Sequence, residues 1–493
     1  MRRMLCVGAL ASLAALLCGC AMGPDFVAPK PDVPAAWARA PAAPVTADRL
    51  ESARWWDGFG DVELSRLEAR ALAANLGVRQ AVLRIDEARA QRRMAAAGAL
   101  PQVDAAAGYQ NTRISERTAT TSLLSALSGG ARSGPPGGAA AALPGMKNPF
   151  DQYQYGLTGS WELDLFGRIR RQVEAADANT AAAKADARAV RISLMAEVAA
   201  VYVALRASQA QRAIAAKAAA TARGLSRLAE DARRAGLGND LDAADAAATA
   251  ASADAELPPL DQAITQDKDQ LALLLAEKPA TLDAELDAAG AVPLVPHVVP
   301  VGLPSDLARR RPDIQMAEAQ LHAAVAQQGV AIASLYPSVS LTGGAGFQAS
   351  RPAALADWAA RYFSVGPSLD LPVFDAGQRR AEVRLEDARA REAALAYAQT
   401  VLAALQEAED AISACGQDQA QHAALEAADD HARQALSLAR RRFEAGAVSF
   451  RDVLDAEGRL EQADQALARG TAASAADTIT LYKALGGGWE AGG

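Results

Sequence analysis

The chain has 493 residues, of which 51% are hydrophobic and 22% charged, and its formal net charge is −8. This acidic balance argues against nucleic acid as a partner. The four His residues are dispersed without metal-ligand spacing, and the sequence has no thiol–imidazole pattern and no phosphate-binding loop. We therefore expect a protein that is not an enzyme and that uses no cofactor or metal.

The first twenty residues form a processing signal. Two arginines precede an apolar run, Met4–Leu17, and a small glycine stands directly before Cys20. We expect residues 1–19 to be a lipoprotein signal peptide and Cys20 to become the acylated N-terminus. The alternative is an ordinary secretory signal that is cleaved nearby.

After removal of the signal, Cys415 is the only cysteine apart from the acylated one, so no intrachain disulfide can form. The mature chain has no apolar run near 18 residues, and we expect no membrane-spanning helix. Any passage through a membrane would have to use strands.

Residues 20–61 are expected to be a lipid-anchored tether followed by the start of the fold. The stretch Gly23–Ala47 is rich in Pro and Ala and has little periodicity, which indicates an extended segment. The aromatic cluster Trp55–Phe59 then marks the beginning of the folded part.

Two copies of one structural unit follow. An offset of 210 positions pairs Gly236 with Gly446 and Asp242 with Asp452, and an upstream offset of 236 pairs Pro101 with Pro337. Such an internal repeat sets the architecture. We assign a first repeat to 62–291, a linker to 292–303, a second repeat to 304–487 and a tail to 488–493. The upstream offset is larger because the first repeat contains extra residues between its matched blocks. These extra residues fall in Ser115–Asn148, and we expect this stretch to be a long surface loop.

Each repeat is expected to run helix, strand, loop, strand, long helix and return helix. The first helix covers about Leu64–Ala99 in one copy and Asp306–Leu335 in the other, and the first long helix covers Gly167–Ala235. Ala-rich composition and coiled-coil spacing predict a rod roughly 100 Å long. Pro258 and Pro259 must break the first return helix, so the two return helices should differ.

The strands follow from period-two alternation of apolar residues. The residues that share one parity in the four predicted strands are Val103, Ala105, Ala107 and Tyr109; Tyr153, Tyr155, Leu157, Trp161, Leu163 and Leu165; Val339, Leu341, Ala345 and Phe347; and Phe363, Val365, Leu369 and Leu371. One apolar face could line a soluble sandwich or face lipid in a barrel. Two hairpins cannot close a barrel alone, so the lipid interpretation requires several chains.

The breaks between long and return helices carry pairs of acids. Asp452 and Asp455 follow the second break, and Asp242 and Asp245 follow the first. Either they stabilise the start of a helix, or they form a ring of acids that narrows the end of a tube. The second interpretation would make Arg441, Arg442 and Arg451 candidate latches, because they lie close by in sequence.

Four sequence motifs in this order resemble the TolC-like outer-membrane efflux proteins, specifically the NodT-type lipoproteins: CAMGPDFVAPKPDVPAAW (Cys20–Trp37), WWDGFGDVEL (Trp55–Leu64), LPSDLARRRPDI (Leu303–Ile314) and AGAVSFRDVLDAE (Ala445–Glu457). The resemblance covers the mature chain. It implies a mainly α fold with a β-barrel part, in which a homotrimer closes a twelve-stranded outer-membrane barrel on an α-helical periplasmic tube.

The resemblance also implies a role and a gate. The role is a passive exit duct for small molecules such as drugs or toxic compounds, with a periplasmic adaptor and an inner-membrane pump of the RND type as partners. Asp452 and Asp455 match the family's periplasmic gate acids. The earlier turn departs from the pattern at Asn239 and Ala244, which leaves Asp242 and Asp245 as a possible second gate turn. The alternatives are a lipid-anchored periplasmic coiled-coil scaffold, or a channel for metal-ion or protein export.

Overall fold

The computed structural model describes residues 21–40, 45–48, 54–113, 149–293, 295–296 and 298–487. The signal segment with Cys20, the insertion Ser115–Asn148 and the tail 488–493 lie outside these residues. The chain folds into two compact units, and each is described by itself. Unit 1 contains residues 1–26, 90–177 and 323–390, and unit 2 contains residues 27–89, 178–322 and 391–493.

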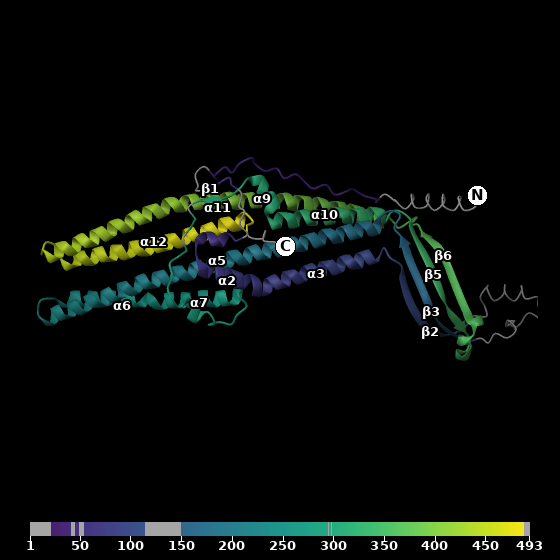
Figure 1. Ribbon diagram of the computed structural model, residues 1–493, viewed down its shortest axis with the longest axis horizontal. Coiled ribbons are helices and arrows are strands. Elements are labelled where there is room, and N and C mark those ends of the chain that lie inside the picture. Colours follow the sequence, from purple (N-terminus) through teal and green to yellow (C-terminus); the bar gives the residue numbers. More distant parts are fainter. Residues whose placement is uncertain are drawn as a thin grey trace, which may run out of the picture. The chain divides into compact units, whose positions relative to one another are not determined.

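Unit 1 is built on a four-stranded antiparallel sheet (Figure 1). Its strands are β2 (Gln102–Thr112), β3 (Phe150–Leu163), β5 (Ser338–Ala349) and β6 (Arg361–Asp370), in the order β2-β3-β5-β6. All four strands were predicted from the alternation of apolar residues, and their existence is confirmed, although Leu165 and Leu371 lie just beyond the ends of β3 and β6. Because β2 and β6 are the outer strands, each leaves one edge of the sheet without a neighbour within the described chain.

The register gives this sheet one apolar and one polar face. Residues directly opposite each other share a face, and Tyr109 lies opposite Tyr153, Tyr155 opposite Phe347, and Ala345 opposite Phe363. The intervening positions of the sheet carry mostly polar side chains: Gln102, Asp104, Gln110, Gln152, Gln154, Thr158, Ser160, Ser340, Thr342, Ser364 and Ser368. The apolar face is uncovered, with Phe363 81% and Val365 73% exposed.

The long helices α5 (Arg168–Arg234) and α11 (Gln378–Glu444) each contain 67 residues, as the repeat predicted. Each contributes residues to both units. In unit 2, α11 turns into the unbroken return helix α12 (Phe450–Ala484) (Figure 1). The return segment after α5 is instead divided into α6 (Asp240–Ala255) and α7 (Leu257–Leu274), with Pro at the start of α7. The predicted difference between the two return helices is therefore confirmed.

The prediction of one continuous helix before each strand pair was wrong. The observed pairs are α2 (Val62–Ala74) with α3 (Leu76–Ala97), and α9 (Pro304–Arg310) with α10 (Pro312–Ala333). At the first break, the side-chain amide of Asn75 donates to the Leu274 carbonyl at 2.8 Å, and the Asn75 Oδ1 accepts from the backbone amide of Val78 at 3.1 Å. At the second, Arg311 is extended because it precedes a proline, a position that disfavours helical backbone.

The core of unit 2 begins at the aromatic cluster that the sequence indicated. Trp55, Trp56 and Phe59 lie buried in the 3-10 helix η2 (Trp55–Phe59), and the Trp55 ring stacks on Tyr482 with centroids 5.0 Å apart. The short helix α8 (Asp283–Leu286) contributes the buried Leu286. The 3-10 helices η3 (Pro352–Ala356) and η4 (Trp358–Ala360) belong to unit 1.

The extended segment before this cluster packs against unit 2. The indole of the buried Trp37 donates to the Gly302 carbonyl at 2.9 Å. Further along, β1 (Val45–Thr46) pairs in parallel with β4 (Val299–Pro300). Across the described residues, we find no helix with an apolar stretch long enough to cross a membrane.

Candidate functional site

The turn between α11 and α12 is built from two helix-ending signals. Gly446 adopts a left-handed backbone with φ 71°, and the Ala447 amide donates to the Arg442 carbonyl at 2.8 Å, which closes α11. Ser449 then caps α12, because its backbone amide donates to the Asp452 carboxylate at 2.8 Å while its hydroxyl oxygen accepts from the Asp452 amide at 3.4 Å. This reciprocal arrangement is a capping box that fixes the angle of the turn.

The two acids of this turn have different surroundings. Hydrogen bonds from the Ser449 hydroxyl and backbone amide, together with the charge of Arg442, hold the pKa of Asp452 below its usual value. Asp455 lies one helical turn further along α12 and is exposed. The helix-capping interpretation therefore applies to Asp452 and does not account for Asp455.

The earlier turn uses an amide in place of the hydroxyl. Asn239 caps α6 by accepting from the Asp242 amide at 2.7 Å, and its own amide group donates to the Asp242 carboxylate at 2.9 Å. Asp245 is exposed, like its counterpart. The departure from the repeat at Asn239 thus preserves the cap geometry and the position of both acids.

The candidate latch arginines are all exposed at the second turn. The positive charge of Arg442 helps to lower the pKa of Asp452. The Arg441 Nε donates to the Ser437 carbonyl at 3.4 Å. Within the described part of this single chain, Arg441, Arg442 and Arg451 make no ion pair with Asp452 or Asp455.

An ion pair that the sequence did not suggest joins the two helices near the turn. Arg440, not Arg441, reaches across the hairpin to Glu457, with 3.1 Å between Nη2 and Oε1. The apolar residues Leu436, Val453 and Ala456 form a small buried cluster at the same place. Besides the capping box, this salt bridge and the small apolar cluster hold the two helices together near the turn.

A second unpredicted cluster lies further along the hairpin. Arg433 binds the buried Asp429 through Nε at 2.7 Å and through Nη2 at 3.2 Å, and the same Nη2 reaches Asp464 on α12. Burial and the neighbouring Asp429 raise the pKa of Asp464. The pKa of Asp429 stays low despite its burial because Arg433 bonds to it. The i,i+4 spacing of Asp429 and Arg433 was the available sequence signal.

A further pair of carboxylates, Asp418 on α11 and Asp477 on α12, lies on the same hairpin. Burial raises the pKa of Asp418 to about 7, and Asp477 on the facing helix adds to this effect. One Asp418 oxygen, Oδ2, is buried without a hydrogen-bond partner. Burial also raises the pKa of the neighbouring Cys415 thiol to about 11, which makes this buried cysteine a poor nucleophile.

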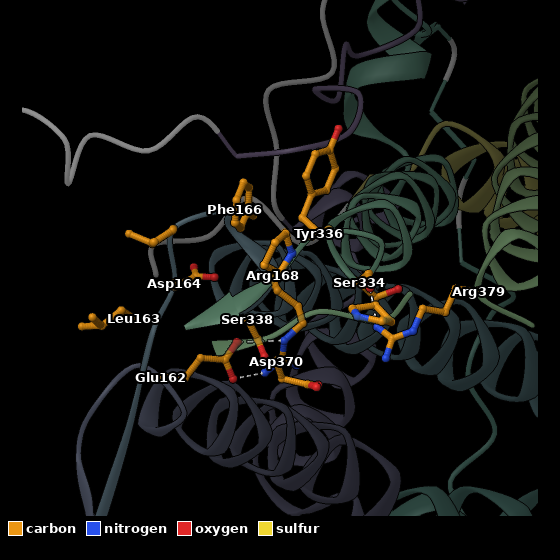
Figure 2. Close-up of a pocket in the computed structure, with 14 residues that line it drawn as sticks. Glu162, Leu163, Asp164, Phe166, Arg168, Ser334, Tyr336, Ser338, Asp370 and Arg379 are labelled. Carbon is orange, nitrogen blue, oxygen red and sulfur yellow. Dashed lines mark hydrogen bonds and ion pairs between the residues drawn. The ribbon is translucent and has the colours of Figure 1, made fainter. Parts of the chain in front are cut away.

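The cavity in Figure 2 lies where the strands of unit 1 meet its helices, and it encloses about 250 Å³. Arg168 forms an ion pair with Glu162 across it at 2.6 Å, and Arg379 donates to the Ser334 carbonyl. Asp164 accepts from the Ile169 and Arg170 amides at 3.0 and 2.9 Å and so caps α5.

Both arginines that line this cavity bond to other lining residues, and the lining includes neither His nor Cys. Among the described residues, no group of three or more His, Cys, Asp or Glu side chains could hold a metal ion. The cavity is therefore best explained as a joint between strand and helix, and the exposed acids of the two turns are the candidate site.

Comparisons with known proteins point in one direction. The profile of a family described as "Outer membrane efflux protein" matches residues 67–277 and 303–487. Outer membrane protein OprJ of Pseudomonas aeruginosa is 33% identical over 98% of this chain and 96% of its own. Antibiotic efflux pump outer membrane protein ArpC of Pseudomonas putida is 31% identical over 97% of this chain and 95% of its own. Among solved structures, the outer-membrane channel OprN is similar with a TM-score of 0.83 and 34% identity, covering 95% of this chain and 100% of that chain.

Proposed function

Because this chain belongs to the outer membrane efflux protein family, we propose that it is the exit duct of a tripartite efflux pump. In this role it conducts small molecules passively from the periplasm to the exterior. The observation that carries the proposal is the sheet of unit 1, with its uncovered apolar face opposite a polar one. A β-barrel needs this combination, because one face meets lipid and the other lines a water-filled lumen.

The sheet also supports a homotrimer. Its outer strands β2 and β6 leave open edges, and unpaired backbone groups are very costly in lipid. Three copies that join β2 of one chain to β6 of the next would close twelve strands and remove every edge. A soluble scaffold, the alternative from the sequence, would leave side chains such as Phe363 and Val365 in water.

Three further features complete the proposal. Cys20 carries the lipid anchor, the helical repeats extend into the periplasm, and Asp452 and Asp455 of three chains surround the periplasmic mouth, with Asp242 and Asp245 as a second acidic turn. Arg441, Arg442 and Arg451 are then available to the acids of neighbouring chains. The partners are a periplasmic adaptor and an inner-membrane pump of the RND type. The family's antibiotic efflux member ArpC supports small molecules as the substrate class.

The proposal is tested by electrophoresis of the protein extracted from outer membranes in mild detergent. We expect an unboiled species of three chains that converts to single chains on boiling, because a closed barrel resists detergent until it is heated. Recovery from the membrane of single chains alone, with or without boiling, would contradict the channel and favour the scaffold.

A further inference from the structure

The apolar face of the sheet carries charge at one end only. Asp151 and Arg361 are the only charged residues among the described positions of this face, and both lie at the end remote from the helices of unit 1, because β3 and β6 begin there and run toward α5 and α11 (Figure 1). In the proposed channel this end lies at the outer surface of the membrane. By the strand register, the positions of the face are Val103, Ala105, Ala107, Tyr109 and Asn111; Asp151, Tyr153, Tyr155, Leu157, Gly159, Trp161 and Leu163; Val339, Leu341, Gly343, Ala345, Phe347 and Ala349; and Arg361, Phe363, Val365, Pro367 and Leu369.

The two charged residues differ in their partners. Asp151 accepts from the Tyr109 hydroxyl and from the Asn111 side-chain amide, each at 2.8 Å. Arg361 has no carboxylate partner in the described part of the chain, and its Nη1 donates to the Trp358 carbonyl at 2.8 Å. An unpaired cation on a face that meets lipid is costly. Arg361 therefore calls for an anion that the single chain does not supply.

Aromatic rings hold this guanidinium beside an open apolar surface. The Arg361 Cζ lies 4.7 Å from the centre of the Trp358 ring, and the Trp358 ring meets Phe347 edge to face with centroids 6.4 Å apart. Trp358 is 70% exposed, and Phe363, two residues further along β6, is 81% exposed. A positioned cation next to apolar rings matches an amphiphile with an anionic head and apolar tails. Arginine binds phosphate oxygens through paired N–H groups.

We propose that Arg361 and Trp358 form a binding site for a phosphorylated lipid of the outer leaflet. The guanidinium binds the phosphate of the headgroup, and the acyl chains pack on Trp358 and Phe363. Charge in the connection between β5 and β6 favours an anion, because Arg351 and Arg361 face only one acid there, Asp357. Since β6 is an outer strand of the sheet, the bound lipid lies along the seam between neighbouring copies. This inference rests on the membrane-spanning sheet of the proposed function.

Binding of diphosphorylated lipid A to the delipidated full-length trimer tests the site, with native mass spectrometry in detergent as the measurement. We expect about tenfold weaker binding in Arg361→Gln than in the parent, because the charge-assisted bonds to phosphate are lost. Arg361→Lys keeps the charge but not the planar fork, and should bind with intermediate affinity. Dephosphorylated lipid A should bind the parent as weakly as lipid A binds Arg361→Gln. Excess inorganic phosphate should not displace lipid A from the parent, because the acyl chains also hold it; displacement would overturn a lipid as the occupant.

Two control variants separate the site from other roles of the arginine. Arg384→Gln removes the same charge from an exposed position of α11 in unit 1 and should bind lipid A like the parent. Asp151→Asn should also bind like the parent. A loss of heat-resistant trimer in both Asp151→Asn and Arg361→Gln, with unchanged lipid binding by the remaining trimer, would assign Arg361 to a contact between copies and overturn the site.

Two outcomes distinguish this inference from the proposed function. Equal binding of lipid A by parent and Arg361→Gln trimers would overturn the lipid site and leave the channel intact. Recovery of single chains alone from the membrane would refute the channel, and with it this inference.

Discussion

A charge on the apolar face of the sheet should prevent assembly of the channel. Val365 is the fifth of ten residues in β6, lies opposite Gly343 near the middle of β5, and is 73% exposed in the single chain. A Lys at mid-bilayer on the lipid face of a barrel costs about 2–4 kcal/mol, so three copies in a trimer cost about 6–12 kcal/mol. This is comparable to the whole stability of a typical domain, about 5–15 kcal/mol. We therefore expect Val365→Lys to lose most of the heat-modifiable trimer from outer membranes.

The neighbouring residue provides a matched control. Ser364 lies on the polar face of the same strand, opposite Gly344, and is also exposed. Ser364→Lys adds the same charge at the same depth, but toward the lumen, and should assemble at close to the parent level. The assay is quantitative immunoblotting of unboiled, detergent-extracted outer membranes. Equal assembly of Val365→Lys and Ser364→Lys would refute the assignment of the apolar face to lipid.

Three further predictions concern the helical hairpin. Asp452→Ala/Asp455→Ala channels should show larger conductance and weaker cation preference in planar bilayers, because the acidic ring and its latches are lost; unchanged channels would leave these acids as helix-end residues only. Arg433→Ala should lower the free energy of unfolding by about 1–3 kcal/mol, which is less than the loss of a fully buried ion pair would cost, because the arginine is half exposed. Thermal unfolding measures the effect, and Arg459→Ala, at an exposed position of the same hairpin, is the control. The folded-state pKa of Asp418 is raised to about 7, so its contribution to the stability of the folded state is present at low pH and is lost as pH rises from about 4 to 7. The melting temperature should therefore fall over this interval. Asp418→Asn should reduce that fall.

The sequence was sufficient for the strands, the long helices and the turns because each depends on a local pattern. Alternation placed Tyr155 and Phe363 on one face, and the register confirms it. Pro258 predicted the break between α6 and α7 because a proline removes a helical hydrogen bond. These signals act within a few residues and need no knowledge of the partner segment.

Features that depend on distant partners were missed. The helix break at Asn75 was missed although Gly77 follows two residues later, because one glycine does not by itself end a helix. The contact that fixes the break, from the Asn75 side-chain amide to the Leu274 carbonyl, lies far along the chain. The pairing of Asp418 with Asp477 depends on the packing of α11 against α12 in the same way. Stabilisation of the helix start by the charge of Asp452 was one of the two alternatives. The capping box itself was not predicted, although the position of Asp452 three residues after Ser449 was a signal for it.

The central claim is that three copies of this chain form a water-filled conduit through the outer membrane. Single-channel recording of the detergent-extracted trimer in planar bilayers tests it most directly, with the wild type and the Asp452→Ala/Asp455→Ala variant measured side by side. The account predicts discrete conductance steps that favour cations in the wild type, and larger steps in the variant. Purified trimer that inserts into the bilayer but conducts in neither form would contradict it.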